Sequence, residues 1–415
     1  MEENSLPKLR HAGFEDAWQK SLLIEQVEIR RGLTYKPSDV RNNGVRVLRS
    51  SNIAEDTFVI SDDDVFVDKG AVNIPRMSNG DILVTAANGS TKLVGKHAIV
   101  KNLADDELAV HGGFMLAIKA EQNDFVNAWM SSKEYKRVLQ FVQGGNGAIG
   151  NLSTSVLKSM KMTIPASKEE QSAIGSLFRT LDDLLAAYKE KLTKYQTFKS
   201  SMLSKMFPKS GQNVPEIRLA EFEGVWKSES LDDASDKIDY GMNVPSKEFD
   251  GKNKYLRITD IDDVSRKFIT ENLTSPSGDL ADCENYLLSD SDVLFARTGA
   301  SVGKTYHYCR EDGRVYFAGF LIRARIKREY DANFVFQNTL TKRYKQFISV
   351  TSQRSGQPGV NSKEYGQFTI NFPVISEQRE VSSFFSILDT LINSCQEKIS
   401  QLETLKKKLL QDMFI

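Results

Sequence analysis

The sequence repeats itself after about half of its 415 residues. At a shift of 208, the start of the second half matches the start of the chain. The matching pairs are Pro7/Pro215, Leu9/Ile217, Arg10/Arg218, Ala12/Ala220, Phe14/Phe222, Glu15/Glu223, Trp18/Trp226, Leu48/Leu256 and Arg49/Arg257. Because a repeat of this length carries one pattern of core positions twice, it constrains the fold more than any single motif does. The sequence therefore predicts a tandem duplication of one structural unit.

The end of each half repeats as well, at a shift of 207. The matching pairs include Glu170-Gln171/Glu377-Gln378, Phe178/Phe385, Leu181-Asp182/Leu388-Asp389, Lys199/Lys406 and Met206-Phe207/Met413-Phe414. Each half thus begins with a leading motif, Pro-x-[Leu/Ile]-Arg-x3-Phe-Glu-x2-Trp. Near its end each half has a closing Glu-Gln motif. Pro165 and Pro373 precede the closing stretches, where a proline can end an extended segment before a helix.

Both closing stretches predict long helices with a coiled-coil seam. Apolar residues recur in steps of four and three, the heptad rhythm that keeps one stripe facing a partner helix. The seam positions are Leu181, Leu185, Tyr188, Leu192, Tyr195, Met202 and Met206, and then Leu388, Ile392, Cys395, Ile399, Leu402, Leu409 and Met413. Lys199 and Lys406 interrupt both seams at the same place. The alternative is that each helix lies on its own domain's core; the shared heptad phase favours mutual packing.

The remainder of each half predicts a mixed α/β globule. Residues 20–157 and 228–365 are rich in Gly, Asn, Ser and Asp, with short β-branched runs and one helical piece near 125–141 and 334–349. The expected fold class is mixed α+β, with two globules each followed by a long helix. The predicted segments are a first globule over 1–157, a central helical spacer over 158–209, a second globule over 210–372 and a C-terminal helical spacer over 373–415.

Composition excludes several classes of protein. Lys plus Arg and Asp plus Glu each number 55, so the chain is no polycation. Segment 158–209 nevertheless carries ten basic and five acidic residues, so the rest of the chain carries 45 basic against 50 acidic. A positive spacer between slightly acidic globules suits a DNA backbone or an acidic partner equally. Three cysteines are too few for a disulfide scaffold. With no apolar signal core and no membrane-length run, we expect a cytoplasmic protein.

Motifs that suggest catalysis have the wrong spacing. Residues 298–305 and 89–97 are similar to a phosphate-binding loop, but three and five residues separate the glycines where four are required. These loops either present Lys and Ser/Thr to phosphates or are plain turns. Asp124, Glu134 and Lys136 imitate a nuclease metal site, yet the second copy lacks both carboxylates. Cys283, His307 and Cys309 lack zinc-site spacing. The sequence predicts a chain with no catalytic residues, no metal and no cofactor.

The two motifs, the globules and the helices together resemble the specificity (S) subunit of Type I restriction-modification systems. The resemblance covers nearly the whole chain. It implies that each globule is a target-recognition domain reading one half of a split site in double-stranded DNA. It also implies that the helices pair antiparallel as a spacer and hold two methyltransferase (M) subunits, which restriction (R) subunits join, with adenine as the methylated base. No membrane partner is implied, and the methyl chemistry comes from a partner.

Helix length and loop divergence agree with that resemblance. From Leu181 to Met206 there are 26 residues, about 39 Å at 1.5 Å per residue, near the 34–36 Å of one duplex turn. Because the loops differ between the repeats while the motifs match, we expect an asymmetric bipartite site. The open alternatives are a duplicated scaffold without a DNA role and an autonomous enzyme.

Loop residues that can reach DNA are the candidate site. Arg and Lys contact phosphates, while Arg, Lys, Asn and Gln read base edges. The candidates are Arg41, Asn43, Arg46, Lys92, Lys96, Gln143 and Asn146 in the first globule, and Arg297, Thr298, Lys304, Arg354 and Gln357 in the second.

Overall fold

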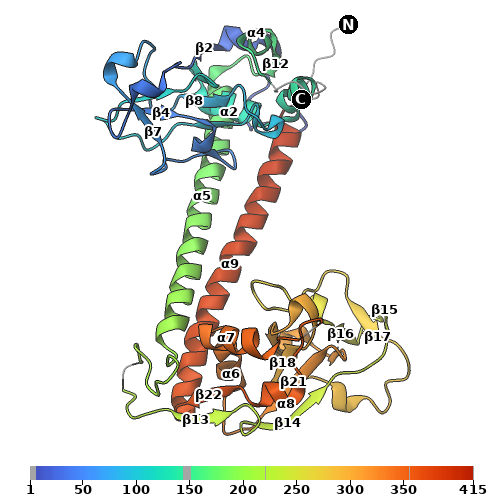
Figure 1. Cartoon of the computed structure of the whole chain (residues 1–415). Coiled ribbons are helices and arrows are strands. Elements are labelled where there is room, and N and C mark those ends of the chain that lie inside the picture. The colour runs from blue at the N-terminus through green and yellow to red at the C-terminus, as the bar shows by residue number, and fades with distance from the viewer. Residues whose placement is uncertain (1–5, 144–150, 220, 355, 415) are drawn as a thin grey trace. The chain divides into compact units, whose positions relative to one another are not determined.

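The computed structural model describes residues 6–143, 151–219, 221–354 and 356–414, without the side chains of 141–143. The chain forms two compact units (Figure 1). Unit 1 comprises Met1–Lys189 and Glu397–Ile415, and unit 2 comprises Glu190–Gln396. Each unit therefore holds one globule and a part of both long helices. The predicted segments are consecutive stretches of the chain. The compact units differ from them, because the end of each long helix belongs to the other unit than its beginning.

The globule of unit 1 is built on a four-stranded antiparallel sheet of order β2-β11-β8-β9 and a second sheet of order β10-β4-β7-β3. Its strands are β1 Gln19–Leu22, β2 Val27–Arg31, β3 Val40–Arg41, β4 Val45–Leu48, β5 Ile53–Ala54, β6 Thr57–Phe58, β7 Val65–Val67, β8 Ile82–Thr85, β9 His97–Ile99, β10 Ala109–His111, β11 Met115–Ala120 and β12 Lys161–Ile164. Its helices are α1 Leu23–Gln26, α2 Asn123–Met130, α3 Lys133–Gln143 and α4 Thr154–Ser159.

The globule of unit 2 repeats this plan with a four-stranded antiparallel sheet of order β14-β21-β18-β19. Its strands are β13 Lys227–Ser230, β14 Ser235–Tyr240, β15 Ser246–Glu248, β16 Lys254–Leu256, β17 Thr274–Pro276, β18 Asp292–Ala296, β19 Thr305–His307, β20 Val315–Phe317, β21 Leu321–Ile326 and β22 Thr369–Phe372. Its helices are α6 Ala332–Asn338, α7 Lys342–Thr351 and α8 Ser362–Gly366. Strands β8 and β18 are buried at every residue, as their apolar runs require.

Each expected single helical piece is in fact two helices. In unit 1, α2 ends at Met130 and α3 begins at Lys133; in unit 2, α6 and α7 are separated in the same way. Ser132 and Thr341 begin the second helix of each pair, because their hydroxyl groups accept from the amides of Tyr135 and Tyr344, both at 3.4 Å. The hydroxyl residues at the break were the sequence signal for this boundary.

The leading and closing motifs of each half are joined by a bidentate Arg–Glu ion pair. Arg10 donates from Nε and Nη2 to the two carboxylate oxygens of Glu170, both at 2.7 Å, and Glu170 is fully buried. Arg218 and Glu377 repeat the pair with the same two distances. A buried carboxylate needs such a paired, bidentate partner. The motifs at opposite ends of each half are therefore two sides of one contact. Beside them, β1 pairs with β12 and β13 pairs with β22.

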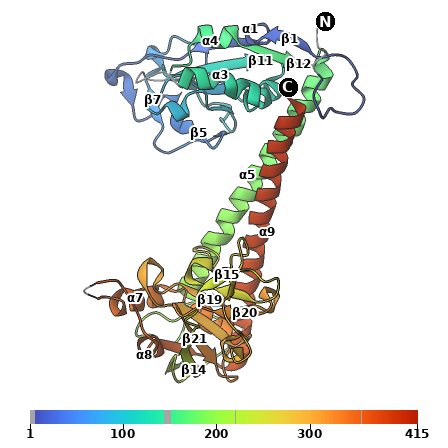
Figure 2. The ribbon, with the colours of Figure 1, turned by 90° about the vertical axis from the view of Figure 1, so that its right-hand side faces the viewer.

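The long helices are α5 Lys168–Lys205 and α9 Ile375–Met413, which run side by side in both ribbon views (Figures 1 and 2). They pair antiparallel. The seam residues are buried or half-buried throughout, as heptad packing demands. Lys406 bonds to Asp182 at 2.5 Å in unit 1, and Lys199 bonds to Asp389 at 2.6 Å in unit 2. The interrupted seam positions thus hold a reciprocal pair of ion pairs.

The last residues of each repeat close the core of the other repeat's globule. Phe414 lies in unit 1, where its ring contacts those of Trp18, Phe125 and Phe178 at centroid distances of 6.5, 5.8 and 5.8 Å. Phe207 lies in unit 2, where its ring contacts those of Trp226, Phe334 and Phe385 at 6.5, 5.4 and 5.8 Å. The repeat thus predicts the residues of this cluster, but not that the helix ends cross over.

Candidate nucleic-acid interface

The same turn occurs at the same place in both units and carries an exposed phenylalanine. Residues 112–115 form the turn that leads from β10 into β11, and residues 318–321 form the turn that leads from β20 into β21. The amide of the fourth residue donates to the carbonyl oxygen of the first, at 2.8 Å in unit 1 and 2.9 Å in unit 2. The third residue is Phe114, 74% exposed, in one unit and Phe320, 59% exposed, in the other. We call these segments aromatic turn 1 and aromatic turn 2.

Matching backbone hydrogen bonds fix both aromatic turns. The carbonyl oxygen of Phe114 accepts from the amide of Ala86 at 2.9 Å, and that of Phe320 accepts from the amide of Arg297 at 3.0 Å. The first residue of each turn donates to the strand end before Arg49 or Arg257, at 2.9 Å in both units. The turns are therefore held between two neighbouring strand ends.

Glycines allow the close approach that these turns need. A Cβ atom at Gly32 would lie 1.9 Å from the carbonyl oxygen of Gly112. A Cβ atom at Gly241 would lie 2.3 Å from the carbonyl oxygen of Ala318. Since neither distance is possible for a side chain, glycine is required at both places. The turn and the adjacent strand end are consequently packed backbone to backbone in each unit.

A cleft opens beside each aromatic turn. Cleft 1, of about 830 Å³, is lined by Leu33, Thr34, Tyr35, Pro37, Val40, Arg49, Ser50, Ala87, Asn88, Gly89 and residues 112–115. Cleft 2, of about 600 Å³, is lined by residues 240–244, Ser246, Tyr255, Arg257, Ile258, Thr259, Arg297 and residues 318–320. Arginine lines both clefts, and no Asp or Glu does so within the part of the chain that the structure describes. Both clefts therefore favour an anionic ligand.

The arginines of the clefts differ in how they are held. Arg49 donates from Nη2 to the carbonyl oxygen of Asp63 at 3.2 Å, and its buried Nε has no partner among the described residues. Arg257 is chelated by Asp260 through two hydrogen bonds of 2.8 Å. The Arg297 guanidinium lies 4.9 Å from the centroid of the Tyr240 ring. Cleft 1 is thus lined by an arginine that is bonded to a backbone carbonyl, and cleft 2 by an arginine stacked on an aromatic ring.

Two of the predicted DNA-contacting loops meet beside Arg297, the one residue of these loops that lines cleft 2 among the described residues. Residues 297–299 run beside residues 357–360, because Thr298 pairs with Gly359 and the amide of Gly299 donates to the carbonyl oxygen of Pro358 at 3.0 Å. Gly299 has a φ of 68°, and a Cβ there would lie 2.8 Å from Nε2 of Gln357. The structure therefore brings Arg297, Thr298 and Gln357 together.

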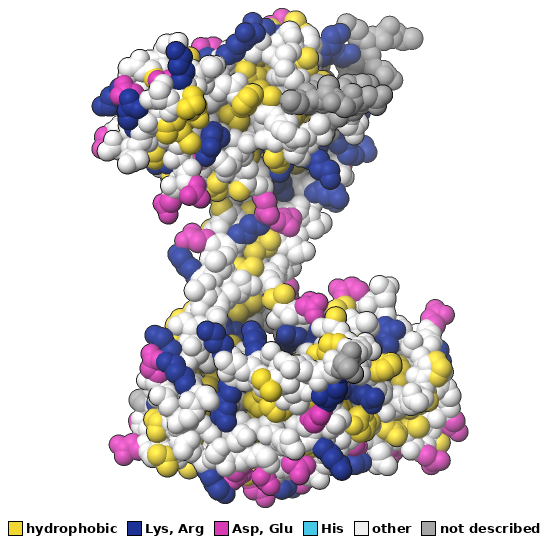
Figure 3. Space-filling model, viewed as in Figure 1, with side chains coloured by type: hydrophobic (Ala, Val, Ile, Leu, Met, Phe, Trp, Pro, Cys, Tyr) yellow, Lys and Arg dark blue, Asp and Glu magenta, His cyan; other side chains and the backbone are white. Residues whose placement is uncertain are grey.

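Other predicted DNA-contacting residues do not belong to the lining of either cleft. Arg41, Asn43, Lys92 and Arg354 are exposed, and Lys96 is half-buried. Arg354 donates to Glu364 at 2.5 Å, and Arg41 lies 3.6 Å from Asp68. The side chain of Gln143 and the whole of Asn146 lie outside the described residues. On the face shown in Figure 3, basic and acidic side chains are interspersed over both globules.

Two predicted DNA-contacting residues turn inward. Arg46 bonds to Asp64 at 2.7 Å and to Glu107 at 2.5 Å, and its guanidinium lies 4.7 Å from the centroid of the Phe66 ring. Lys304 is 9% exposed; its Nζ donates to the carbonyl oxygen of Ile261 at 3.0 Å and pairs with Asp263 at 2.5 Å. Because these donors are satisfied inside the globules, we leave both residues out of the proposed DNA surface.

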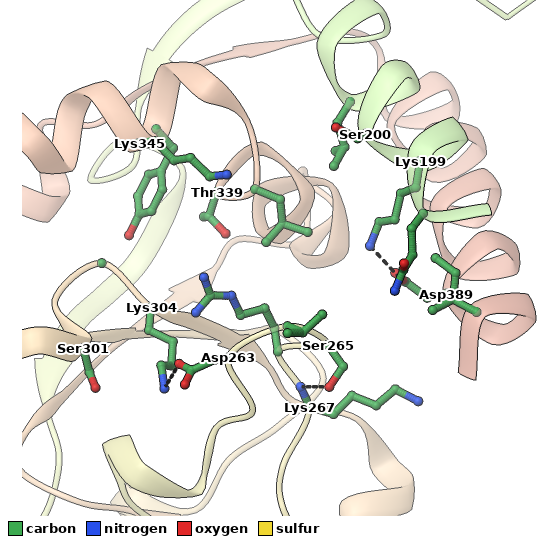
Figure 4. Close-up of a pocket in the computed structure, with 18 of the residues that line it drawn as sticks. Lys199, Ser200, Asp263, Ser265, Lys267, Ser301, Lys304, Thr339, Lys345 and Asp389 are labelled. Atoms are coloured by element: carbon green, nitrogen blue, oxygen red, sulfur yellow. Dashed lines mark hydrogen bonds and ion pairs between the residues drawn. The ribbon is translucent and has the colours of Figure 1, made fainter. Parts of the chain in front are cut away.

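A second cavity in each unit lies between the globule and the long helices. In unit 2 it measures about 520 Å³. Figure 4 shows Lys199 of α5 and Asp389 of α9, two of its lining residues, pointing toward each other and joined by a hydrogen bond. In unit 1 the equivalent cavity of about 420 Å³ contains the matching pair, Lys406 and Asp182. Five basic and two acidic residues line the first cavity, and five basic and four acidic residues line the second. We call these the junction cavities.

The motifs that imitate catalytic sites are used structurally. Glu134 accepts from Nε1 of Trp129 at 2.7 Å, and burial raises its pKa. Asp124 instead pairs with Arg179 at 2.9 Å, so the two carboxylates serve different contacts. His307 stacks on Phe336 with ring centroids 6.0 Å apart. Among the described residues, no three His, Cys, Asp or Glu side chains are grouped to hold a metal ion, and no helix is long and apolar enough to cross a membrane.

Sequence reasoning missed the aromatic turns and the cleft arginines. The available signals were Gly113-Phe114 against Gly319-Phe320, and Leu48-Arg49 against Leu256-Arg257. The second match belongs to the repeat, and its two arginines line the clefts. The first lies at a shift of 206, where insertions between the repeats conceal it.

The comparisons with known proteins agree over the length of the chain. The family model for the Type I restriction modification DNA specificity domain matches residues 15–194 and 226–404. The chain is 21% identical over 406 residues to the Type I restriction enzyme EcoKI specificity subunit of Escherichia coli, covering 92% of this chain and 85% of that protein. It is 21% identical over 422 residues to the Type I restriction enzyme StySPI specificity subunit of Salmonella potsdam, covering 96% and 89%.

A solved structure shares the fold. The crystal structure of the Type I restriction-modification system S subunit from M. genitalium superimposes with a TM-score of 0.66 at 15% identity. The superposition covers 99% of both chains.

Proposed function

Because the chain belongs to the Type I restriction-modification DNA specificity family, we propose that it selects the DNA sequence on which a methyltransferase and restriction complex acts. The observation that carries this proposal is the repeated cleft. Each unit holds a rigid aromatic turn beside an arginine-lined cleft with no carboxylate in its described lining. Two such clefts suit two separate contacts with a polyanion.

The site read by the protein is expected to be asymmetric and bipartite. The framework of the two clefts matches, but the polar groups within them differ. Cleft 1 offers Tyr35, Ser50 and Asn88. Cleft 2 offers Asn243 and Arg297. Since different donors and acceptors favour different bases, the two units read different half-sites.

We further propose that two methyltransferase subunits dock along α5 and α9 at the junction cavities, and that restriction subunits join this core. Two equivalent sets of groups, Asp182 with Lys406 and Asp389 with Lys199, support binding of two copies of one partner. The chain itself supplies no catalytic group in this proposal, and the complex works in the cytoplasm, where the host DNA lies. A scaffold without a DNA role remains the second candidate, but the family match and the anionic preference of the clefts disfavour it.

The test is to produce the chain with candidate methyltransferase subunits and to map methylated positions in a plasmid library and in the host genome. The proposal expects methylation at a split, non-palindromic sequence only when all components are present. The isolated chain should show no methyl transfer and no DNA cleavage. A palindromic or continuous modified sequence would contradict the bipartite reading, and methylation that is independent of this chain would contradict the proposed function itself.

A further inference from the structure

We propose that Phe114 and Phe320 are stacking residues, each of which enters the base stack of one half-site when the protein binds duplex DNA. This inference rests on the proposed function and assigns it a mechanism. The two rings are 74% and 59% exposed, although they belong to the same turn of two units whose loops otherwise diverge. A single exposed apolar residue needs no explanation, but the same one at the same place in both copies does.

Hydrogen bonds hold the backbone of both aromatic turns in place. Each is a tight four-residue turn closed by its own hydrogen bond, and the carbonyl oxygen of its phenylalanine is bonded to the neighbouring strand end at 2.9 or 3.0 Å. The required glycines, Gly32 and Gly241, pack the turn against the next strand. A projection fixed in this way loses little conformational entropy when it inserts into a ligand, which is how affinity is gained by preorganisation.

The surroundings of the rings select a nucleic acid as the ligand. Arg49 lies in cleft 1, and Arg257 and Arg297 lie in cleft 2. No carboxylate lines either cleft in the described ranges, so an anionic ligand is favoured over a neutral or basic protein surface. Apolar wedges, phenylalanine among them, unstack base steps in proteins that bind duplex DNA.

The shared phenylalanine and the differing polar groups of the clefts have different roles in binding DNA. Every base has a face on which an aromatic ring can stack, so stacking tolerates sequence. The same phenylalanine can therefore serve both half-sites, while the residues that differ between the clefts read the base edges. This explains why the repeat keeps the ring and changes the lining.

The experiment uses the complex of the chain with its methyltransferase subunits and a duplex that carries the mapped site. One duplex has 2-aminopurine, whose fluorescence rises on unstacking, in the first half-site, and a second duplex has it in the other half-site. We expect wild type to raise the fluorescence of both duplexes. Phe114→Ala should abolish the rise in one half-site only, and Phe320→Ala should abolish it in the other only. Each should raise Kd for the full site by about 5- to 150-fold.

The controls separate stacking from stability and from surface hydrophobicity. Phe114→Trp and Phe320→Trp should retain the affinity for the full site, because a ring that can stack remains. Val350→Ala removes an apolar side chain that is 72% exposed on α7 and should change neither readout. Because both rings are exposed, the alanine variants should keep the melting temperature of wild type.

Two results would overturn the inference while leaving the proposed function in place. One is specific binding by wild type together with unchanged Kd and fluorescence for both alanine variants. The other is an equal loss of fluorescence in both half-sites from either single variant. If the wild-type complex does not prefer the mapped duplex to a scrambled one, the proposed function fails instead.

Discussion

Phe414 offers a direct test of the exchange of helix ends. It is the penultimate residue of the chain, yet it is 6% exposed in unit 1, where it contacts three aromatic rings. Replacing a buried phenylalanine with alanine costs about 3–5 kcal/mol. Because Phe414 follows the end of α9 and the chain there can relax, we take the lower figure of about 3 kcal/mol. For a unit of this size that corresponds to a fall of roughly 6–12 °C in Tm.

The assay is differential scanning calorimetry combined with hydrogen exchange resolved by peptide. Phe414→Ala should lower the Tm of unit 1 and the protection of β8 and β11, while protection of β18 and β21 stays unchanged. Phe207→Ala should give the mirror result, with unit 2 affected. Leu405→Ala is the matched control on α9, because Leu405 is 45% exposed and should shift Tm little. A loss of protection near Phe207 in the Phe414→Ala variant, with unit 1 intact, would refute the exchange.

Three further predictions concern the Arg10–Glu170 ion pair, the pH dependence of stability and the length of the helices. Arg10→Met should destabilise unit 1 by about 3–5 kcal/mol in urea unfolding, because it leaves Glu170 buried and unpaired, and adding Glu170→Met should restore most of the loss. Burial lowers the pKa of His111 to about 4, below its ordinary 6.5. The contribution of neutral His111 to the free energy of unfolding is therefore complete above pH 6.5 and is lost as pH falls toward 4. At pH 5 wild type should have lost about 2 kcal/mol of stability that His111→Asn does not lose. The control is His11→Asn at an exposed position, which should behave like wild type. Inserting seven residues after Lys189 and seven after Gln396 keeps the heptad phase and adds about 10 Å, so the unread spacer should widen by about three base pairs with both half-sites unchanged. An unchanged spacer would count against a spacing role of the helices.

Periodicity and repetition predict the two α+β globules and the paired long helices because they report burial directly, but they do not predict the exchange of helix ends or the break within each helical piece. The heptad of α5 and α9 required a partner helix, and the match of Lys199 with Lys406 marked the place where Asp389 and Asp182 meet them. The matching Arg10 and Arg218 could be recognised as important, but their partners lie 160 and 159 residues away. Sequence order alone does not reveal such contacts.

The candidate site was harder to predict because a basic residue in a loop has several possible partners. Arg46 and Arg297 look alike in the sequence, yet Arg46 is bound to two carboxylates and Arg297 lines a cleft. Only the tertiary structure decides where the donors of an arginine are satisfied. The exposed Phe114 and Phe320 are hard to recognise in the sequence for the opposite reason, because an apolar residue in a strand-rich segment indicates a core position.

The exchange of helix ends also orders events during synthesis. Unit 2 is one continuous stretch, Glu190–Gln396, whereas unit 1 needs Glu397–Ile415 to complete its core. At 5–20 residues per second, the ribosome takes about 10–45 s between Lys189 and Phe414. The globule that is made first is thus the last to be finished, and it waits with Trp18 and Phe125 uncovered until Phe414 has been made. A prematurely terminated product would lose its N-terminal unit and keep its C-terminal one.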